Sequence, residues 1–221
     1  MSPIYLIPPD ELVFPHPNEA SPDGIVGIGG DLSPERLLLA YRFGIFPWYG
    51  EGDPIIWWSP DPRLVLFPDK LKIAKSMRSY LNRDRFRWTT DQCFSEVIHR
   101  CSTSDRKGQD GTWILPEMEE AYIKLHLMGY AHSVEVWQED QLVGGLYGLR
   151  IGDVFYGESM FTEVPNASKF GFIKWVQHLQ GEGIILIDCQ QDTAHLRQFG
   201  AELISRESFL DYLRSNWMRS S

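Results

Sequence analysis

The chain of 221 residues lacks most of the features that mark a metal, redox or membrane protein. It contains only three cysteines, Cys93, Cys101 and Cys189, without a CxxC pair, so we expect reduced thiols and neither a disulfide framework nor a zinc site. None of its six histidines lies in an HxH or HExxH pattern, and we expect no metal. No apolar run approaches the roughly 20 residues that a membrane helix needs, so we expect no membrane partner.

The N-terminal segment, MSPIYLIPPDELVFP, also lacks the basic and apolar regions of a signal peptide. With 43% hydrophobic and 23% charged residues, the composition is that of an ordinary globular protein. A chain of this length can bury a full core, as one large domain or as one domain with a small appendage. We therefore expect a globular, cytoplasmic protein.

Charge is unevenly distributed along the chain, whose formal net charge is −9 at pH 7. Residues 1–60 carry two Arg against eight acidic residues, and residues 108–221 carry eight Lys and Arg against sixteen. Residues 61–107 carry eleven Lys and Arg against six acidic residues, a net charge of +5. Such a basic stretch on an acidic protein can attract a phosphate-bearing ligand, although charge alone fits a solvated helix face equally well.

Residues 41–67 form the most unusual stretch, because proline, glycine and aromatic residues are concentrated there. Four prolines remove backbone donors, so the stretch is predicted to be an ordered loop that is neither a regular helix nor a central strand, up to the strand-like RLVLF at its end. Trp48, Trp57 and Trp58 are costly to leave in water, and each indole needs a hydrogen-bond partner when buried. The loop is therefore expected to pack on a domain or to bind a flat ligand.

Three elements are predicted in the first half of the chain. A helix begins at Pro34, with Ser33 as its N-cap, and ends before Gly44. The preceding glycine-rich residues 24–30 are predicted to form a turn rather than a dinucleotide-binding loop, because no β-rich run comes before them. Residues 70–87, here called the basic segment, have apolar residues at nearly helical spacing with basic residues on the other faces, which predicts a basic helix.

The second half predicts strands, then a long helix, then a buried strand. Residues 86–90 are predicted as a strand, and Asp91 as the cap of a helix with one apolar stripe. A helix follows from Pro116 to Gly129, and residues 132–161 indicate an antiparallel meander. A long helix capped by Asn166 precedes the all-apolar strand IILID, and Thr193 opens a short helix before the terminal one.

Two carboxylates are candidates for chemistry. Glu158 interrupts the apolar run VFYGESMF, where a carboxylate must be paired, hydrogen-bonded or kept for a cationic ligand. Asp188 follows an apolar strand, where it either caps a turn and helix or belongs to a ligand site. A thiol nucleophile made by Cys189 and His195 is less favoured, because neighbours in sequence rarely form a catalytic pair.

Eight motifs along the chain resemble the leucyl/phenylalanyl-tRNA-protein transferase family: GIFPWY, DPIIWWSPDPR, GTWI, HSVEVW, LVGGLYG, GESMF, NASK and IDCQ. The resemblance implies an aminoacyltransferase that moves Leu or Phe, with Met as a further candidate, from aminoacyl-tRNA to the N-terminal Arg or Lys of proteins and marks them for degradation. It implies an α+β fold, with a small N-terminal domain over residues 1–62 and an acetyltransferase-like domain with a mixed, largely antiparallel sheet over residues 63–221. No cofactor is expected.

The resemblance also implies roles for individual residues. Glu158 would hold the α-amino group of the aminoacyl moiety, and Asp188 and Gln190 would form the catalytic pair. The residues expected to line the pocket for the Leu or Phe side chain are Phe155, Met160 and Ile187, together with Leu146 and Trp175, which stand where we expect Met and Phe in relatives. Trp48 and Trp113 would contact the terminal adenosine, whereas Trp57 and Trp58 would fasten the small domain to the large one. The acceptor stem of the tRNA would lie on the basic segment, at Lys72, Lys75, Arg78, Arg83 and Arg85.

Two other classes of function remain as alternatives. A non-enzymatic module that binds RNA 3′ ends could stack bases on Trp48 and Trp113 over the basic segment, but it would have no use for Glu158 and Asp188. A coenzyme A-dependent N-acyltransferase should show a glycine-rich pyrophosphate loop before the long helix, where this chain has VPNAS.

Overall fold

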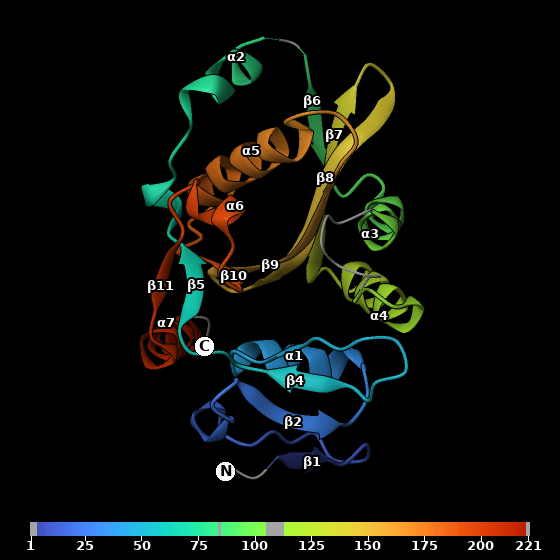
Figure 1. Cartoon of the computed structure of the whole chain (residues 1–221), viewed down its shortest axis with the longest axis vertical. Helices are drawn as coiled ribbons and strands as arrows, with labels where there is room; N and C mark the ends of the chain where they lie inside the picture. Colours follow the sequence, from blue (N-terminus) through green and yellow to red (C-terminus); the bar gives the residue numbers. More distant parts are fainter. Residues whose placement is uncertain (1–3, 84, 105–112, 220–221) are drawn as a thin grey trace.

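The structure is a computed structural model that describes residues 4–83, 85–104 and 113–219. Two sheets lie one above the other in Figure 1, the N-terminal one at the bottom of the view. The smaller sheet has four strands in the order β1-β2-β4-β3 and the larger has seven in the order β11-β5-β10-β9-β8-β7-β6. The predicted α+β class is confirmed, whereas the division into domains at residues 62 and 63 stays a prediction.

The smaller sheet is built from short strands and carries one helix. Its strands are β1 (Tyr5–Ile7), β2 (Ile25–Gly29), β3 (Phe46–Pro47) and β4 (Ile56–Trp58), and the short 3-10 helix η1 covers Pro17–Glu19. Helix α1 (Pro34–Arg42) begins as predicted, because the Ser33 side chain accepts a hydrogen bond from the backbone N–H of Arg36. Gly44 follows the helix with φ +71°, a left-handed conformation that glycine adopts at no steric cost.

Two predictions for this part are wrong. Ile25–Gly29 is strand β2 rather than a turn, and its Gly27 packs closely on β1, because a Cβ there would lie 2.7 Å from the end of the Ile7 side chain. Strand β4 pairs with β2 on one side and β3 on the other, so the aromatic stretch does contain a central strand. The prolines flank this strand rather than interrupt it, which leaves its backbone donors in place.

Trp57 and Trp58 hold the smaller sheet together. The Trp57 indole is fully buried and donates to the Gly29 carbonyl at 2.8 Å, and the Trp58 indole donates to the Trp48 carbonyl at 2.6 Å. Both bonds connect segments of the N-terminal part. A contact of these two residues with the larger sheet, as expected from the sequence, stays a prediction.

The larger sheet is antiparallel except between β9 and β10, which run parallel. The predicted meander is confirmed, since β7, β8 and β9 pair in succession, and the apolar strand β10 is buried at every residue. The strands are β5 (Arg63–Leu66), β6 (Arg87–Thr90), β7 (Ala131–Gln138), β8 (Gln141–Ile151), β9 (Val154–Thr162), β10 (Leu186–Gln190) and β11 (Glu202–Ile204).

Helices cover both faces of the larger sheet. In Figure 1, α5 (Ala167–Gly181) crosses one face, and α3 (Phe94–Thr103) and α4 (Pro116–Leu127) lie on the other. Helix α5 packs closely, because a Cβ on Gly171 would lie 2.6 Å from a Val136 methyl group. Asn166 precedes α5 but its side chain makes no capping bond, contrary to the prediction. Helices α6 (Ala194–Arg197) and α7 (Arg206–Arg219) follow as predicted, and Thr193 does cap α6.

The predicted basic helix is wrong. The described residues of the basic segment contain the end of the 3-10 turn η2 (Pro68–Lys70), a second turn η3 (Lys75–Met77), the four-residue helix α2 (Arg78–Leu81) and the first residue of β6. The backbone N–H of Lys72 donates to the Phe199 carbonyl at 2.8 Å, so a tertiary contact takes a donor that a helix would use. Asp91 is likewise not a helix cap: its carboxylate accepts from the Ser133 N–H at 2.8 Å.

The two sheets meet around α1 and α7. A Cβ on Gly44 would lie 2.9 Å from the Phe209 ring, and the Arg206 guanidinium donates to the Ser59 carbonyl at 2.7 Å. One buried hydrophobic cluster contains residues from both sheets, so their cores are continuous. In the part of the chain that is described, no helix combines the length and apolar character needed to cross a membrane.

Candidate active site

A cavity of about 770 Å³ opens between the smaller sheet, strands β8 to β10 and helices α5 and α6. Its volume falls within the ordinary range of small-molecule sites. Eight residues predicted for the site line it: Trp48, Trp113, Leu146, Glu158, Met160, Ile187, Asp188 and Gln190. The structure thus brings together residues that are up to 142 positions apart in the sequence, since these eight residues run from Trp48 to Gln190.

Glu158 on β9 is a carboxylate of the cavity that accepts three side-chain hydrogen bonds. Its Oε1 accepts from the Tyr41 hydroxyl at 2.7 Å and from the Gln190 amide at 2.9 Å, and its Oε2 accepts from the Tyr122 hydroxyl at 3.2 Å. These donors come from α1, β10 and α4, three elements distant in sequence. The prediction that this carboxylate must be hydrogen-bonded is confirmed.

The electrostatic setting of Glu158 favours its protonated form. Burial, opposed by the Tyr41, Tyr122 and Gln190 hydrogen bonds and reinforced by the negative charge of Asp188, raises the pKa of Glu158 from 4.5 to about 8. Part of the side chain still faces the cavity. A cationic group placed beside it would favour the ionised form, so the carboxyl is suited to receive an ammonium ion.

Asp188 on β10 is fully buried in an ion pair with Arg63 of β5. Arg63 Nε donates to Oδ1 at 2.8 Å and Nη2 donates to Oδ2 at 2.7 Å, which is the two-point geometry that arginine forms with carboxylates. The guanidinium also lies over the rings of Phe46 and Phe209, at 4.6 and 4.8 Å from their centroids. Asp188 borders the cavity, but both of its oxygens are engaged within the protein.

Asp188 also stabilises the backbone conformation of Gln190. The Gln190 N–H donates to Asp188 Oδ1 at 2.9 Å, and Gln190 has φ +60°, where the register of β10 against β5 shifts. A left-handed conformation is costly for a residue with a side chain and persists only where its surroundings enforce it. The result is that the Gln190 amide reaches Glu158, so the two carboxylates are linked through one residue.

Two tryptophans from distant parts of the sequence line the cavity. Trp48 follows β3 of the smaller sheet and Trp113 precedes α4, and both side chains are half-buried. Trp48 is held by an edge contact with Trp58, at 5.6 Å between ring centroids and 64° between planes. Indole faces at the rim of a cavity are suited to stack on a base or another flat group.

Comparisons with known proteins find sequence relatives over most of the chain. The family model described as leucyl/phenylalanyl-tRNA protein transferase matches residues 65–214, and the model of the N-terminal domain of the same proteins matches residues 30–61. A leucyl/phenylalanyl-tRNA–protein transferase of Christiangramia forsetii is 58% identical over 212 residues, covering 95% of this chain and 100% of the relative. One of Pseudomonas fluorescens is 54% identical over 206 residues, covering 92% and 91%.

The chain belongs to this family. Among solved structures, it resembles a GCN5-related N-acetyltransferase from Kribbella flavida, with a TM-score of 0.39 and 11% identity over 75% of this chain and 58% of that one. It also resembles L-PGS from Bacillus licheniformis, with a TM-score of 0.42 and 14% identity over 72% of this chain and 51% of that one.

Of the residues predicted to hold the apolar side chain, Leu146, Met160 and Ile187 line the cavity. Phe155 and Trp175, which were also expected to line it, are buried and lie outside the cavity lining of the described residues. Their rings contact each other edge to face at 5.4 Å, so they support the wall from behind. Phe172 of α5 lines the cavity instead and was not predicted.

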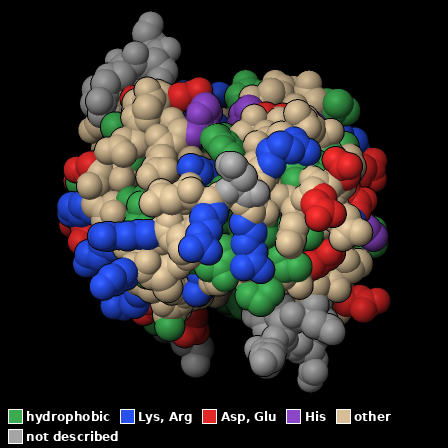
Figure 2. All heavy atoms as spheres, turned by 90° about the horizontal axis from the view of Figure 1, so that it is seen from above, with side chains coloured by type: hydrophobic (Ala, Val, Ile, Leu, Met, Phe, Trp, Pro, Cys, Tyr) green, Lys and Arg blue, Asp and Glu red, His purple; other side chains and the backbone are tan. Residues whose placement is uncertain are grey.

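The basic residues predicted to bind tRNA are exposed although they lie on no long helix. They are Lys72, Lys75, Arg78, Arg83 and Arg85. Figure 2, which views the molecule from the α2 end, shows Lys and Arg side chains gathered on one side of this face. The Arg85 guanidinium lies 5.1 Å from the Tyr80 ring centroid, which holds it at the surface. Two further residues of the basic stretch, Arg106 and Lys107, lie outside the described residues.

The proposed thiol nucleophile has no support from its surroundings. Burial and the nearby Asp188 raise the pKa of the Cys189 thiol well above its ordinary value, and its Sγ donates to the Ile187 carbonyl at 3.8 Å. His195 Nδ1 contacts the Gln198 amide at 3.2 Å. The thiol is therefore protonated at neutral pH, which is the unreactive form.

Sequence analysis missed three residues that contact the carboxylates. Arg63 is a charge at the start of the apolar strand RLVL, the same kind of interruption that drew attention to Glu158. Tyr41 and Tyr122 lie in apolar positions of α1 and α4, where a tyrosine cannot be distinguished from an ordinary core residue. Only the fold places their hydroxyls against Glu158.

Proposed function

We propose that the chain transfers Leu or Phe from aminoacyl-tRNA to proteins whose N-terminal residue is Arg or Lys, with Glu158 as the group that receives the aminoacyl α-amino group. Membership of the family supports the activity, and the cage of donors around Glu158 supports its role. The substrates are aminoacyl-tRNA and a protein N-terminus, and the product is a peptide bond that marks the protein for degradation.

The reaction is the aminolysis of an ester. The acceptor α-amine, after losing a proton, attacks the carbonyl carbon; a C–N bond forms, the bond to the terminal ribose oxygen breaks, and that oxygen takes up a proton. The ester is already activated, so holding the amine and the carbonyl together can supply much of the rate. Leu146, Met160, Ile187 and Phe172 are suited to hold the apolar side chain, and Trp48 and Trp113 to hold the adenosine.

Asp188 is proposed as a positioning residue. Arg63 donates to both of its oxygens, and the Gln190 N–H donates to one of them. Both oxygens therefore already accept hydrogen bonds within the protein, which disfavours a direct role in accepting a proton from the amine. Gln190 also lines the cavity, and its amide nitrogen donates to Glu158, so its amide oxygen is the proposed acceptor for the attacking amine.

The decisive test is transfer in a purified system. The protein is expected to move labelled Leu or Phe from charged tRNA to a peptide beginning with Arg or Lys and much less to the same peptide beginning with Asp or Glu. Failure of transfer to every peptide would refute the proposal. Binding of charged tRNA without transfer would favour the RNA-binding alternative. Acylation that requires acetyl-coenzyme A would favour the coenzyme A-dependent N-acyltransferase.

Binding of tRNA is expected to depend on salt through the exposed basic residues. Each phosphate contact contributes about one unit to the slope of log K against log salt. Replacing Arg83 and Arg85 together by Gln should therefore weaken tRNA binding at low salt and make the slope shallower by about 1–2 units. The measurement is the dissociation constant over a salt series, with Arg150→Gln as control because that residue pairs with Glu182 instead. An unchanged slope would remove the basic segment from the interface.

Two further expectations belong to this proposal. We propose the cytoplasm as the location, because charged tRNA is found there. We also propose that residues 1–62 and 63–221 are the two domains, which is supported by the smaller sheet ending at Trp58 and the larger beginning at Arg63. Limited proteolysis followed by mass spectrometry tests this division.

A further inference from the structure

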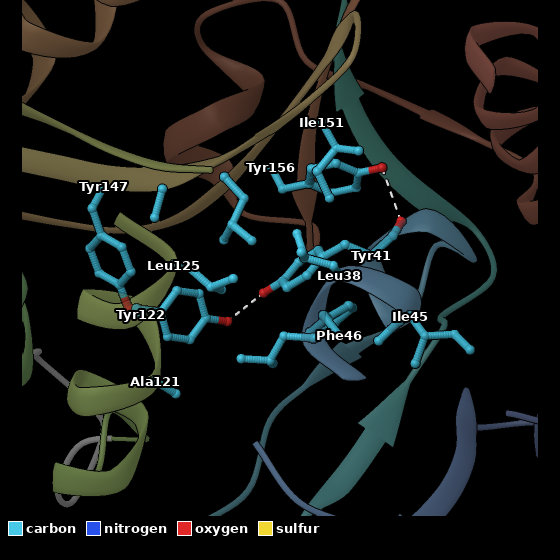
Figure 3. Packing of buried hydrophobic residues seen from close by; sticks show 14 of the residues in the cluster. Leu38, Tyr41, Ile45, Phe46, Ala121, Tyr122, Leu125, Tyr147, Ile151 and Tyr156 are labelled. Carbon is cyan, nitrogen blue, oxygen red and sulfur yellow. Dashed lines mark hydrogen bonds between the residues drawn. The ribbon is translucent and has the colours of Figure 1, made fainter. Parts of the chain in front are cut away.

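Two buried tyrosines beside Glu158 have no role in the reaction described above. Tyr41 lies on α1, which packs with the smaller sheet. Tyr122 lies on α4, on one face of the larger sheet. Figure 3 shows the two rings pointing at each other from these helices, with their hydroxyl groups in contact. Both side chains are fully buried.

The two hydroxyls and the Glu158 carboxyl form a closed ring of contacts. Tyr41 bonds to Oε1, Tyr122 bonds to Oε2, and the hydroxyls bond to each other. A ring of three hydrogen bonds needs three protons. When Glu158 is ionised, the two hydroxyls supply only two, so one contact is left without a proton. When Glu158 is protonated, its own proton completes the ring: each hydroxyl donates once and accepts once, and the carboxyl group donates through one oxygen and accepts through the other.

We propose that Tyr41 and Tyr122 are positioning residues that set the charge state of Glu158, and that the N-terminal part of the chain thereby contributes directly to the active centre. The inference rests on the proposed function for its effect on transfer, but not for its effect on the carboxyl itself. Burial keeps a proton on Glu158 while the cavity is free, and that proton closes the ring. An incoming ammonium group then favours the ionised carboxylate, and the two tyrosines donate to it.

The other groups around Glu158 agree with this arrangement. The Asp188 carboxylate raises the pKa of Glu158, although Arg63 neutralises much of that charge, and Gln190 contributes a neutral donor from β10. Tyr147 of β8 packs its ring against Tyr122, at 5.6 Å between centroids. The Tyr41 and Tyr122 bonds both lower the pKa of Glu158 against the effect of burial. Removing either donor should therefore raise that pKa.

Tyr41→Phe tests the inference, and Tyr156→Phe is its matched control. Tyr156 is equally buried and its hydroxyl donates to the Tyr41 backbone carbonyl at 3.0 Å, so it lies beside Tyr41 and contacts another acceptor. The titration of Glu158 is followed by carboxyl NMR or infrared difference spectroscopy, with Glu158→Gln to assign the signal. In Tyr41→Phe the midpoint should rise by about one pH unit, whereas Tyr156→Phe should leave it in place.

Transfer provides a second measurement. At pH 7, Tyr41→Phe should raise the KM for aminoacyl-tRNA about tenfold with a smaller change in kcat, and single-turnover assays at higher pH should recover the loss. A midpoint that does not move in Tyr41→Phe, or that moves equally in Tyr156→Phe, overturns the inference. If Tyr41→Phe does not fold, Tyr122→Phe decides by the same titration. If the wild-type protein transfers nothing, the proposed function fails while the titration still tests the ring.

Discussion

Replacing Asp188 by Ala is expected to lower the free energy of unfolding by about 3–5 kcal/mol and to abolish measurable transfer. The substitution leaves the Arg63 guanidinium buried without the carboxylate that accepts two of its hydrogen bonds. It also removes the acceptor that holds Gln190 in its left-handed conformation, so the amide at the cavity is released. Chemical denaturation and the transfer assay measure the two effects on the same preparation.

The control is the double variant Arg63→Met with Asp188→Leu. Removing both charges leaves apolar side chains in a buried site, which is often neutral or stabilising, so most of the lost stability should return while transfer stays absent. This separates the loss of activity from the loss of folding. A single Asp188→Ala variant that unfolds like the wild type would contradict the structure around Arg63.

Glu158→Gln is expected to reduce transfer about 10- to 100-fold, because an amide cannot give the ammonium group the charged hydrogen bond that is worth about 1.5–3 kcal/mol. The same variant should have a flatter dependence of stability on pH. The folded wild type keeps a proton on Glu158 up to a pKa of about 8, whereas the unfolded chain releases it near 4.5. Wild-type stability should therefore fall as pH rises between these values, and the variant should lack that slope.

Unfolding curves at pH 5 and pH 8 measure the pH dependence of stability, and a transfer assay at pH 7.5 measures the loss of activity. Glu182→Gln is a suitable control, since that carboxylate is exposed and pairs with Arg150 far from the cavity lining. The control should match the wild type in both assays. A Glu158→Gln variant with normal transfer would remove the carboxyl from substrate binding.

Local patterns in the sequence were sufficient to predict most strands of the larger sheet, although β11 was missed. The meander, the apolar strand β10 and most of the helices depend on periodicity and turn residues that each segment carries in itself. The predictions for the basic segment and for strands β2 and β4 were wrong because local patterns do not decide these conformations. Lys72 gives its backbone donor to Phe199, and Gly27 accommodates Ile7, so partners far away in the sequence decide these conformations.

The residues of the candidate site likewise fall into those that the sequence predicted and those that it did not. Glu158 and Asp188 were recognised because a charge in an apolar run needs an explanation wherever it occurs. Tyr41, Tyr122 and Phe172 were missed because aromatic residues on apolar helix faces are normal core residues. Phe155 and Trp175 were predicted to line the cavity, but their rings pack on each other outside its lining. Strand and helix patterns show which side of an element is buried, but not how far a side chain lies from a cavity.

The position of β5 has a consequence for the order in which the protein is made. Arg63 pairs with a residue 125 positions later, and β5 lies in the sheet between β10 and β11. During synthesis the buried side chains of Leu64, Val65 and Leu66 must therefore wait, without their final neighbours, until almost the whole chain has been translated. Contacts of such long range slow folding and leave an apolar strand open to aggregation. The nascent protein is thus expected to need protection at this strand, and it cannot assemble its active centre before strand β10, which carries Asp188 and Gln190, has been made.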